Sequence, residues 1–464
     1  MTFRFPQKQG GGQLTFGNHE RVPKVVINNT EAKAIIQHKA FPSSVVAPAN
    51  INLSATQKAL LKFHFCLGHW NMSWIQSLLR HGVLECPPGV SKITSKEAIC
   101  SCGACQFAKQ TKKPDGAKTH GIRPEKKGAL IKNQLRVGGT VFTDQFVSSV
   151  PGRLLHSFGK EKEHEMQTGG TIFIDAASTF MHVDTQVSLG AAETIRSKNK
   201  LEREAMRHGI KIAGYRGDNG VYRSAEFMAD CDKKNQALDF SGVGAHHHNG
   251  TAERAIRTIS TCARAMMIHA MIHNPNEVNL DLWPFAVKYA VYLWNKMPKE
   301  DGGKSPEEVF YSVISDHQQL REAKVFGCPA YVLDPRLQDG KKIPKWSPRS
   351  RLGQFLGRSE VHAGTVGLIR NLRTGKITPQ YNVVYDNHFT TVSAETHEDN
   401  VPVPEGFDRL FEFSREYLID DEDDVVVRPP TSTSTEESQP TKRVSFDLDR
   451  DSSQVSEGDD AVTS

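Results

Sequence analysis

The chain has 464 residues and a formal net charge of +5. At about 150 residues per domain, this length predicts roughly three domains. Residues 396–464 carry 19 acidic and 6 basic side chains, which leaves residues 1–395 with a net charge of +18. A basic body with an acidic tail is typical of a protein that binds a polyanion, most commonly nucleic acid.

Composition and hydropathy exclude several classes of protein. No apolar stretch reaches the roughly 18 residues that span a bilayer. The first residues lack the charged-then-apolar pattern of a secretory signal. The 8 cysteines, concentrated in the first third of the chain, fit a metal site in a reducing compartment better than a disulfide framework. We therefore expect neither a membrane protein, nor a secreted scaffold, nor a coiled coil.

The first 136 residues predict three segments. Residues 1–50 contain a glycine run (Gly10–Gly12) without sustained periodicity, which predicts a loosely ordered N-terminal segment. Residues 54–114 predict a small helical unit that bears cysteine and histidine. Residues 115–136 predict a basic linker.

Residues 137–305 predict an α/β domain with a mixed sheet, because a run of strands is followed by alternating strand and helix. The expected elements are a strand at Thr140–Val147, a hairpin at Thr171–Val187, a helix at 190–208, a strand at Ile210–Tyr215, a helix at Ser224–Asn235, a strand at Ala237–Val243, and long helices beginning near Thr251 and Glu277.

The last two segments differ sharply in composition. Residues 306–395 predict a small β-barrel, because short strands alternate with Gly and Pro. The expected strands are Cys328–Leu333, Arg351–Leu356, Thr365–Arg370 and Lys376–Val384. Residues 396–464, acidic and then rich in Ser and Thr, predict a disordered tail.

Two histidines and two cysteines have the spacing of a metal site. His64 and His69 lie five residues apart on a predicted helix, and Cys102 and Cys105 form a Cys-x-x-Cys turn. Two nitrogens and two sulfurs make a closed tetrahedral set, the structural form of Zn²⁺ coordination. The alternative is a half-buried histidine pair beside two reduced thiols. A segment of about 60 residues buries only a modest core, so zinc would supply much of its folding free energy.

Three acidic residues stand where packing does not explain a charge. Asp144 lies inside the first predicted strand, and Asp218 follows the strand Ile210–Tyr215 in a Gly-Asp-Asn-Gly turn that allows a sharp bend. Glu253 lies in the first turn of a predicted helix. Oxygen ligands from separate elements suit hard cations, and two such ions promote phosphodiester displacement. We therefore interpret Asp144, Asp218 and Glu253 as ligands of two catalytic Mg²⁺ or Mn²⁺ ions.

The helix that carries Glu253 has a clear apolar period. The predicted apolar stripe comprises Ala252, Ala255, Ile256, Ile259, Ala263, Met266, Met267 and Ala270. A second line, about a quarter-turn away, comprises Glu253, Arg257, Ser260 and Arg264. Glu253 would thus lie at the border between core and solvent. The alternative is that it is an N-terminal helix acid stabilised by the helix dipole.

Together these motifs resemble the integrase of copia-type LTR retrotransposons, from about Lys58 to Asn387. The most specific string is Ala245-His246-His247-x-Asn249-Gly250-x-Ala252-Glu253-Arg254. The other matching strings, in chain order, are His64-x-x-Leu67-Gly68-His69, Cys102-x-x-Cys105-Gln106-x-Ala108-Lys109, Ile174-Asp175-x-x-Ser178, Arg216-x-Asp218-Asn219-Gly220, Trp283-x-x-Ala286, Asn295-x-x-Pro298, Lys304-Ser305-Pro306 and Val325-Phe326-Gly327-Cys328-Pro329-Ala330-Tyr331.

The resemblance implies a zinc-stabilised helical domain, a ribonuclease-H-like core and a small β-barrel. It also implies that Asp144, Asp218 and Glu253 are the catalytic metal ligands and that the substrate is the element's own DNA end. Such integrases join a DNA 3′-hydroxyl to a target strand by direct transesterification. The resemblance further implies a multimer on DNA, and the substrate leads us to expect action in the nucleus and otherwise a cytoplasmic location.

Three features depart from the family pattern. Asp218 and Glu253 are separated by 34 residues, one fewer than usual. Residues Leu155–Gln167 form an apparent insertion, and Arg358 replaces the aromatic residue expected after the Leu-Gly of the barrel. The chain has no Asp-Thr-Gly or Asp-Ser-Gly protease motif and no Tyr-x-Asp-Asp polymerase motif, so we interpret it as an isolated integrase or a truncated polyprotein.

Three hypotheses for function remain open at this stage. The first is a Mg²⁺-dependent DNA strand transferase. The second is a non-catalytic nucleic-acid-binding protein from a truncated or repurposed element. The third is another ribonuclease-H-like nuclease, which would need neither the zinc module nor the barrel. The acidic tail is a candidate contact for a protein partner or for the basic body. The expected DNA contacts, mainly to phosphates, are Lys109, Lys112, Asn249, Arg254, Arg257 and Arg264.

Overall fold

The computed structural model describes residues 53–87, 101–110, 135–154, 162–241, 249–274, 277–299 and 303–392. It also describes the backbone of a small antiparallel sheet made of β1 (Thr2–Arg4), β2 (Gln13–Thr15) and β3 (Lys24–Val25). The side chains described all belong to one compact unit. Most of the basic linker, the loop 242–248 and the acidic tail lie outside the described residues. Among those described, no helix combines the length and apolar character needed to cross a membrane.

Three helices form the N-terminal module: α2 (Ala55–Cys66), α3 (Met72–Arg80) and α4 (Gly103–Ala108). Ser54 and Gln57 begin α2 with a reciprocal pair of side-chain-to-backbone hydrogen bonds of 3.1 and 3.0 Å, which satisfies two N–H groups that a helix start leaves unpaired. The Asn71 side chain accepts from the Ser73 N–H at the start of α3. These caps fix where each helix begins and therefore the direction of the loop between them.

The central sheet has the strand order β6-β5-β4-β7-β8. Its strands are β4 (Val141–Gly152), β5 (Gln167–Asp175), β6 (Met181–Gln186), β7 (Gly214–Gly217) and β8 (Ala237–Phe240). Strands β4, β5 and β6 are antiparallel neighbours, whereas β7 and β8 run parallel to β4. This mixed order is the ribonuclease-H-like arrangement and confirms the predicted fold class. The short helix η3 (Glu163–Glu165) precedes β5.

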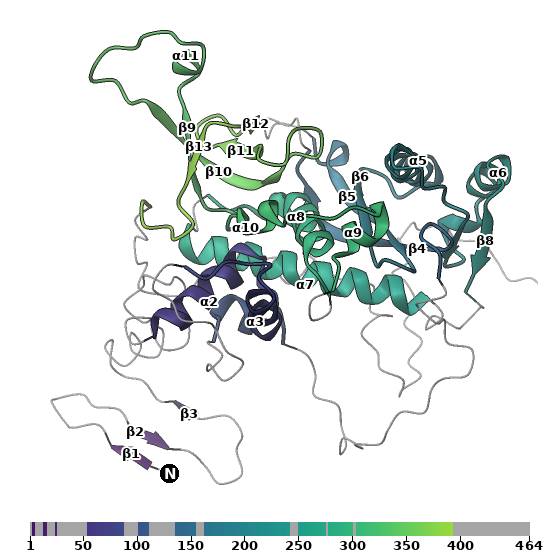
Figure 1. Ribbon diagram of the computed structural model, residues 1–464, viewed down its shortest axis with the longest axis horizontal. Coiled ribbons are helices and arrows are strands. Elements are labelled where there is room, and N and C mark those ends of the chain that lie inside the picture. The colour runs from purple at the N-terminus through teal and green to yellow at the C-terminus, as the bar shows by residue number, and fades with distance from the viewer. Residues whose placement is uncertain are drawn as a thin grey trace, which may run out of the picture. The chain divides into compact units, whose positions relative to one another are not determined.

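Helices cover both faces of the central sheet (Figure 1). One apolar cluster joins Val141, Phe173 and Tyr215 to α5 (Ala191–Arg207), η4 (Val221–Arg223) and α6 (Ala225–Lys233). A second cluster joins the other face to α7 (Gly250–His273), η6 (Leu280–Leu282) and α8 (Trp283–Lys296). The sheet is thus buried on both sides, and its strand ends are the places where polar groups can gather.

Several predicted boundaries are wrong. The strand expected at Lys376–Val384 is two strands, Ile377–Gln380 and Val383–Tyr385. The strand expected at Ile210–Tyr215 is observed at Gly214–Gly217, because Ile210 and Ile212 fill the core from a loop and mimic strand burial. The helix expected from Glu277 begins at Trp283. Pro284 occupies its first turn, the one part of a helix where proline fits without breaking a hydrogen bond.

The C-terminal sheet has five antiparallel strands in the order β12-β11-β10-β9-β13. They are β9 (Pro329–Leu333), β10 (Ser350–Arg358), β11 (Gly367–Asn371), β12 (Ile377–Gln380) and β13 (Val383–Tyr385). Edge strands β12 and β13 are joined by two residues, which reach at most about 11 Å. In a flat five-stranded sheet the two edge strands would lie about 19 Å apart. The sheet therefore curls on itself, which confirms the small barrel. Helices α9 (Pro306–Tyr311), α10 (Gln318–Arg321) and α11 (Pro335–Gln338) complete this region.

Helix α7 connects the three regions through one continuous core. The eight residues of its predicted apolar stripe are all buried. From Cys262 onward the helix is buried on further sides as well. The Phe65 ring of α2 packs at a tilt against His269, and Phe389 stacks on His273, with ring centroids 4.3 and 4.4 Å apart. A single apolar cluster accordingly contains residues of the N-terminal module, the central sheet and the barrel.

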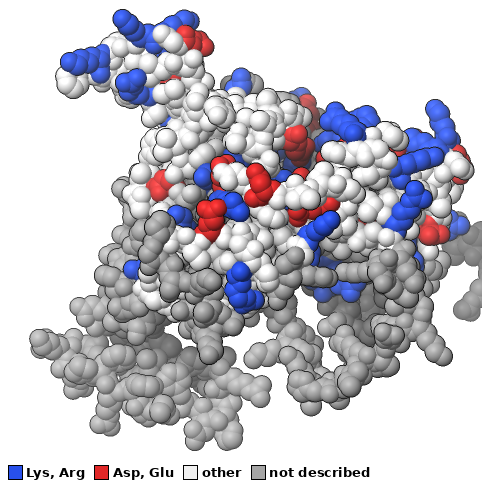
Figure 2. Space-filling model, in the orientation of Figure 1, with Lys and Arg blue, Asp and Glu red and all other residues white. Residues whose placement is uncertain are grey.

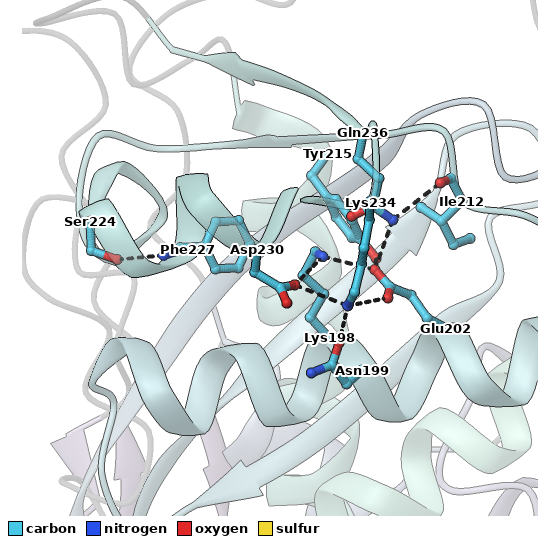
Figure 3. Close-up of polar contacts among 10 residues, drawn as sticks. All are labelled: Lys198, Asn199, Glu202, Ile212, Tyr215, Ser224, Phe227, Asp230, Lys234 and Gln236. Atoms are coloured by element: carbon cyan, nitrogen blue, oxygen red, sulfur yellow. Dashed lines mark hydrogen bonds and ion pairs between the residues drawn. The ribbon is translucent and has the colours of Figure 1, made fainter. Parts of the chain in front are cut away.

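A buried polar cluster holds α5 and α6 together (Figure 3). The Lys198 ammonium is fully buried and lies 2.7 Å from Asp230 and 3.0 Å from Glu202. Lys234 pairs with the same two carboxylates at 3.0 and 2.7 Å. The Tyr215 hydroxyl of β7 donates to Glu202. Two cations therefore balance two anions, and the cluster positions the end of the strand that leads to Asp218.

Candidate active site and metal centre

Asp144 occupies the central strand and is buried. The backbone N–H of Gln145 donates to its Oδ1 at 2.8 Å. Strand β7 pairs alongside β4 in parallel, with Phe142 opposite Arg216. The residue that follows β7 therefore emerges beside Asp144, and that residue is Asp218.

The turn that carries Asp218 is held by its neighbours in the sequence. The Asn219 amide donates to the Ser241 carbonyl at 2.8 Å, and the Gly220 N–H donates to Asp218 Oδ1 at 3.1 Å. A Cβ at position 217 would lie 2.8 Å from the Tyr222 ring, so Gly217 is required for this close approach. The Arg-x-Asp-Asn-Gly motif thus fixes a carboxylate at the edge of the sheet.

Glu253 is half-buried in the first turn of α7. Asn249, the residue that precedes this helix, is buried, and its amide donates to the Thr143 carbonyl at 3.1 Å. The hydroxyl of Thr143 in turn donates to Tyr222. These contacts attach the start of α7 to the strand of Asp144, so Glu253 and Asp144 are positioned by the same backbone.

The electrostatics show that the three carboxylates share one region. Burial raises the pKa of Asp144 to about 7. The Gln145 N–H opposes this increase, and the negative charges of Asp218 and Glu253 add to it. Carboxylate oxygens are the ligands that Mg²⁺ and Mn²⁺ prefer, and a divalent cation would relieve this repulsion. The residues present therefore fit such an ion.

The three carboxylates do not converge on one point as tightly as the His/Cys group described next. Among the described residues, His64, His69, Cys102 and Cys105 are the one group of His, Cys, Asp or Glu that could hold a single ion, with ligand atoms all within 4.8 Å of one another. A wider arrangement of carboxylates is compatible with two ions about 3.5–4 Å apart.

The predicted zinc ligands come together where α2, its following loop and α4 meet. His64 Nδ1 lies 2.7 Å from the Trp70 carbonyl. Donation to that carbonyl leaves the Nε2 lone pair of His64 pointing inward. His64 Nε2 lies 3.2 Å from His69 Nδ1 and 3.3 Å from Cys105 Sγ, and His69 Nδ1 lies 3.5 Å from Cys102 Sγ.

These separations match the edges of a zinc tetrahedron. Zn–N bonds of about 2.0–2.1 Å and Zn–S bonds of about 2.3 Å give edges of about 3.3 Å between nitrogens and about 3.6 Å between nitrogen and sulfur. Burial lowers the pKa of His69 to about 4, which favours the neutral, metal-binding imidazole. The Cys102 thiol and the two imidazoles hold the pKa of Cys105 well below its usual range, so Cys105 is the readier thiolate. The observed donor set fits structural Zn²⁺.

The predicted DNA contacts divide into two groups. Arg254 and Arg257 are exposed on α7, so their contact with phosphates remains a prediction, and Lys112 lies outside the described residues. Asn249 contacts Thr143, whereas Lys109 donates to the His69 carbonyl and Arg264 to the Ala108 carbonyl. Each of these three side chains therefore joins parts of the protein, and a DNA contact at them stays a prediction.

Sequence reasoning did not identify the residues that position the carboxylates and His64. Thr143, Tyr222 and Ser241 position the carboxylate turns, and Trp70 orients His64, yet none has a spacing signal. The string Ile174-Asp175-x-x-Ser178 is a structural turn in which Asp175 accepts from Ser178 and from the Gly138 N–H. Arg358, the departure in the barrel, donates to the carbonyls of Thr365 and Glu322 and lies over the Phe355 ring.

The fold has a ribonuclease-H-like core, and the His/Cys cluster that precedes it fits a zinc-binding module. No model of a protein family matches the chain. It is 34% identical over 150 residues to the retrovirus-related Pol polyprotein from transposon TNT 1-94 of Nicotiana tabacum, covering 31% of this chain and 10% of that protein. It is 25% identical over 361 residues to the Pol polyprotein from transposon RE1 of Arabidopsis thaliana, covering 75% of this chain and 21% of that protein.

Solved structures similar to the chain include two from viruses. The magnesium-bound integrase catalytic core domain of HTLV-2 is 16% identical, with a TM-score of 0.27, covering 38% of this chain and 98% of that one. The simian T-cell lymphotropic virus intasome is 15% identical, with a TM-score of 0.26, covering 54% and 83%. The sequence relatives, retrovirus-related Pol polyproteins from plant transposons, confirm the resemblance to retrotransposon proteins. The chain spans about a tenth to a fifth of the length of the curated relatives it matches.

Proposed function

We propose that this protein is an integrase, a metal-dependent polynucleotidyl transferase that joins the 3′-ends of an element's DNA to target DNA. The observation that carries the proposal is the placement of three carboxylates. Asp144 lies on the central strand, Asp218 follows the neighbouring parallel strand, and Glu253 begins the helix attached to the first. Their charges interact.

Each group in this site has a distinct task. Asp144, Asp218 and Glu253 would hold the divalent cations, which activate an attacking oxygen and stabilise the leaving oxygen. Burial of Asp144 excludes water from one side of the site. The exposed Arg254 and Arg257 lie one turn apart on α7, next to Glu253, where they can hold phosphates.

The proposed reaction conserves the number of phosphodiester bonds. The oxygen of an element 3′-hydroxyl attacks a target phosphorus, a new P–O bond forms, and the target's bridging P–O3′ bond breaks. The hydroxyl proton is lost from the attacking oxygen, and the leaving 3′-oxygen gains one. Because two element ends must be joined to one target, we propose a homo-multimer on DNA acting in the nucleus.

A joining assay with labelled oligonucleotide ends tests this function. The wild-type chain should join ends to target DNA when Mg²⁺ or Mn²⁺ is added and not without it. Asp144→Asn should reduce joining more than about 100-fold, because losing even an outer-shell partner of a metal costs 10–100-fold. DNA binding should survive. Asp239→Asn, the same change at an exposed site on β8, is the matched control.

Two results would count against the proposal. Wild-type joining by Asp144→Asn would show that the site assignment is wrong. A folded wild-type chain that binds DNA but joins no ends with either metal would favour the non-catalytic nucleic-acid-binding alternative.

A further inference from the structure

The longest connection in the barrel projects from it as an arm. Residues 334–349, which we name the β9–β10 arm, leave β9 and return to β10, and they contain α11 (Figure 1). The Asp334 N–H donates to the Arg349 carbonyl at 2.8 Å and closes its base. Pro335, Pro344 and Pro348 restrict its backbone. The arm is therefore an extended loop with a defined base.

The arm is strongly basic. It carries five basic and two acidic side chains, a net charge of +3, and the blue side chains gather there in Figure 2. The acids pair within the arm, Asp334 with Arg336 at 3.0 Å and Asp339 with Lys341 at 3.7 Å. Lys342, Lys345 and Arg349 are exposed, and no carboxylate of the described residues lies within 4.0 Å of them. Three cations thus remain available to an outside anion.

An aromatic side chain stands among these cations. Trp346 is 90% exposed, whereas the other four tryptophans of the chain are buried or partly buried. The Lys345 ammonium lies 5.6 Å from its ring centroid. Cations close to an exposed aromatic face are the combination that binds single-stranded nucleic acid, through phosphate contacts and base stacking. An acidic peptide would use the cations but would leave the indole without a role.

We propose that the β9–β10 arm binds DNA that has unpaired bases, with Lys342, Lys345 and Arg349 on phosphates and Trp346 stacked on a base. The proposal rests on the proposed function, because it supplies a second DNA contact for that activity. It differs from the active site in its location on the barrel and in its independence of divalent metal. The arm would hold an unpaired strand, such as the one at a DNA end, while the carboxylates act elsewhere.

Equilibrium binding of a fluorescein-labelled single-stranded DNA, measured by anisotropy with the full chain in the Asp144→Asn background, tests the proposal without any joining. The triple variant Lys342→Ala, Lys345→Ala, Arg349→Ala should bind at least about 10-fold more weakly. The slope of log Kd against log salt should be smaller by about 2 for this variant, because each of the three lost phosphate contacts contributes about 0.7 to it. The control Arg203→Ala, Arg207→Ala, Lys211→Ala removes three exposed charges elsewhere and should leave the slope unchanged.

Trp346 separates stacking from charge. Trp346→Ala should weaken single-strand binding about 5- to 160-fold, the range of one base–aromatic stack, and should leave binding to a blunt duplex unchanged. Trp346→Phe should retain most of the affinity. Single-stranded DNA should also quench the emission of the exposed tryptophan, and Trp346→Phe should abolish that quenching.

Either of two results would overturn the proposal. One is equal affinity of the arm triple variant and its control. The other is a Trp346→Ala variant that binds single-stranded DNA as tightly as the wild type does, or whose affinity for duplex DNA falls by the same factor as its affinity for single-stranded DNA. Because no joining is measured, failure here is distinguishable from failure of the catalytic proposal.

Discussion

At the scale of single residues, the two candidate metal sites are destabilised in different ways without their ions. In the His/Cys cluster, the Cys102 thiol and the two imidazoles hold the pKa of Cys105 well below its usual range, so these neighbours accommodate the thiolate charge. Asp144 is instead a buried carboxyl beside two further acids, and its pKa is raised to about 7. A raised pKa means that the fold favours the neutral carboxyl, so ionisation of Asp144 lowers stability.

The stability of the protein should therefore depend on pH through Asp144. The neutral Asp144 carboxyl contributes its full stabilisation below about pH 4. This stabilisation decreases as the pH rises to about 7 and is absent above that, which lowers the free energy of unfolding by about 1–4 kcal/mol. Asp144→Asn removes the titrating group, so the variant should be more stable than the wild type at pH 8 and similar at pH 4. Urea unfolding at both pH values, without Mg²⁺ and without a chelator that would take zinc, measures this.

Added Mg²⁺ provides the control for that experiment. It should raise the urea midpoint of the wild type at pH 8 and leave that of Asp144→Asn nearly unchanged, because only the former retains the full ligand set. A variant less stable than the wild type at pH 8 would contradict the sign of the Asp144 effect.

At the scale of elements, a glycine sets the distance between the barrel and α7. Gly327, with φ +79°, lies where an added Cβ would be 2.4 Å from Ala270 Cβ. Gly340 has a similar φ of +73° and nothing within 4 Å. Alanine at either position bears a left-handed backbone cost of about 1–2 kcal/mol, but only Gly327→Ala adds a collision. The glycine of the Phe-Gly-Cys-Pro motif is thus needed where the chain approaches α7 closely.

The matched pair of substitutions tests that contact. Gly340→Ala should lower the free energy of unfolding by about 1–2 kcal/mol, and Gly327→Ala should lower it by at least about 1 kcal/mol more, in the range of core overpacking. Ala270→Gly should recover part of the loss when combined with Gly327→Ala, because it removes the colliding atom. Denaturant midpoints of these three variants and of Ala270→Gly alone give the comparison, and equal losses at the two glycines would refute the contact.

How far the sequence could predict these elements depends on the range of the interactions involved. Local signals, such as the apolar stripe of α7, the Cys-x-x-Cys turn and the glycines around Asp218, predicted the fold class and the His/Cys cluster. Partners distant in sequence could not be predicted. The sequence did not reveal that Lys109 and Arg264 donate to carbonyls 40 and 156 residues away. Ile210 and Ile212 show that burial in a loop resembles burial in a strand.

At the scale of the whole molecule, the N-terminal module with its His/Cys cluster and the helix that carries Glu253 share one core. The His69 ring lies 4.9 Å from His269 of α7, and Trp70 lies 5.3 Å from Trp294 of α8. The Trp74 indole donates to the Pro298 carbonyl at 2.7 Å. Helix α7, which His69 contacts through His269, carries Glu253 in its first turn. Packing therefore connects the His/Cys cluster to the helix that carries Glu253.

Zinc removal should accordingly destabilise the catalytic region as well as its own module. The chain should contain one Zn²⁺, and 1,10-phenanthroline should lower the thermal midpoint in a single transition and speed amide exchange along α7. Cys105→Ser should reproduce both effects, because three ligands no longer close the tetrahedron. Cys86→Ser, at a half-buried cysteine of the same module, should not. If α7 kept its amide protection after zinc loss, the module would fold as a separate unit, and the shared core would not transmit its stability to Glu253.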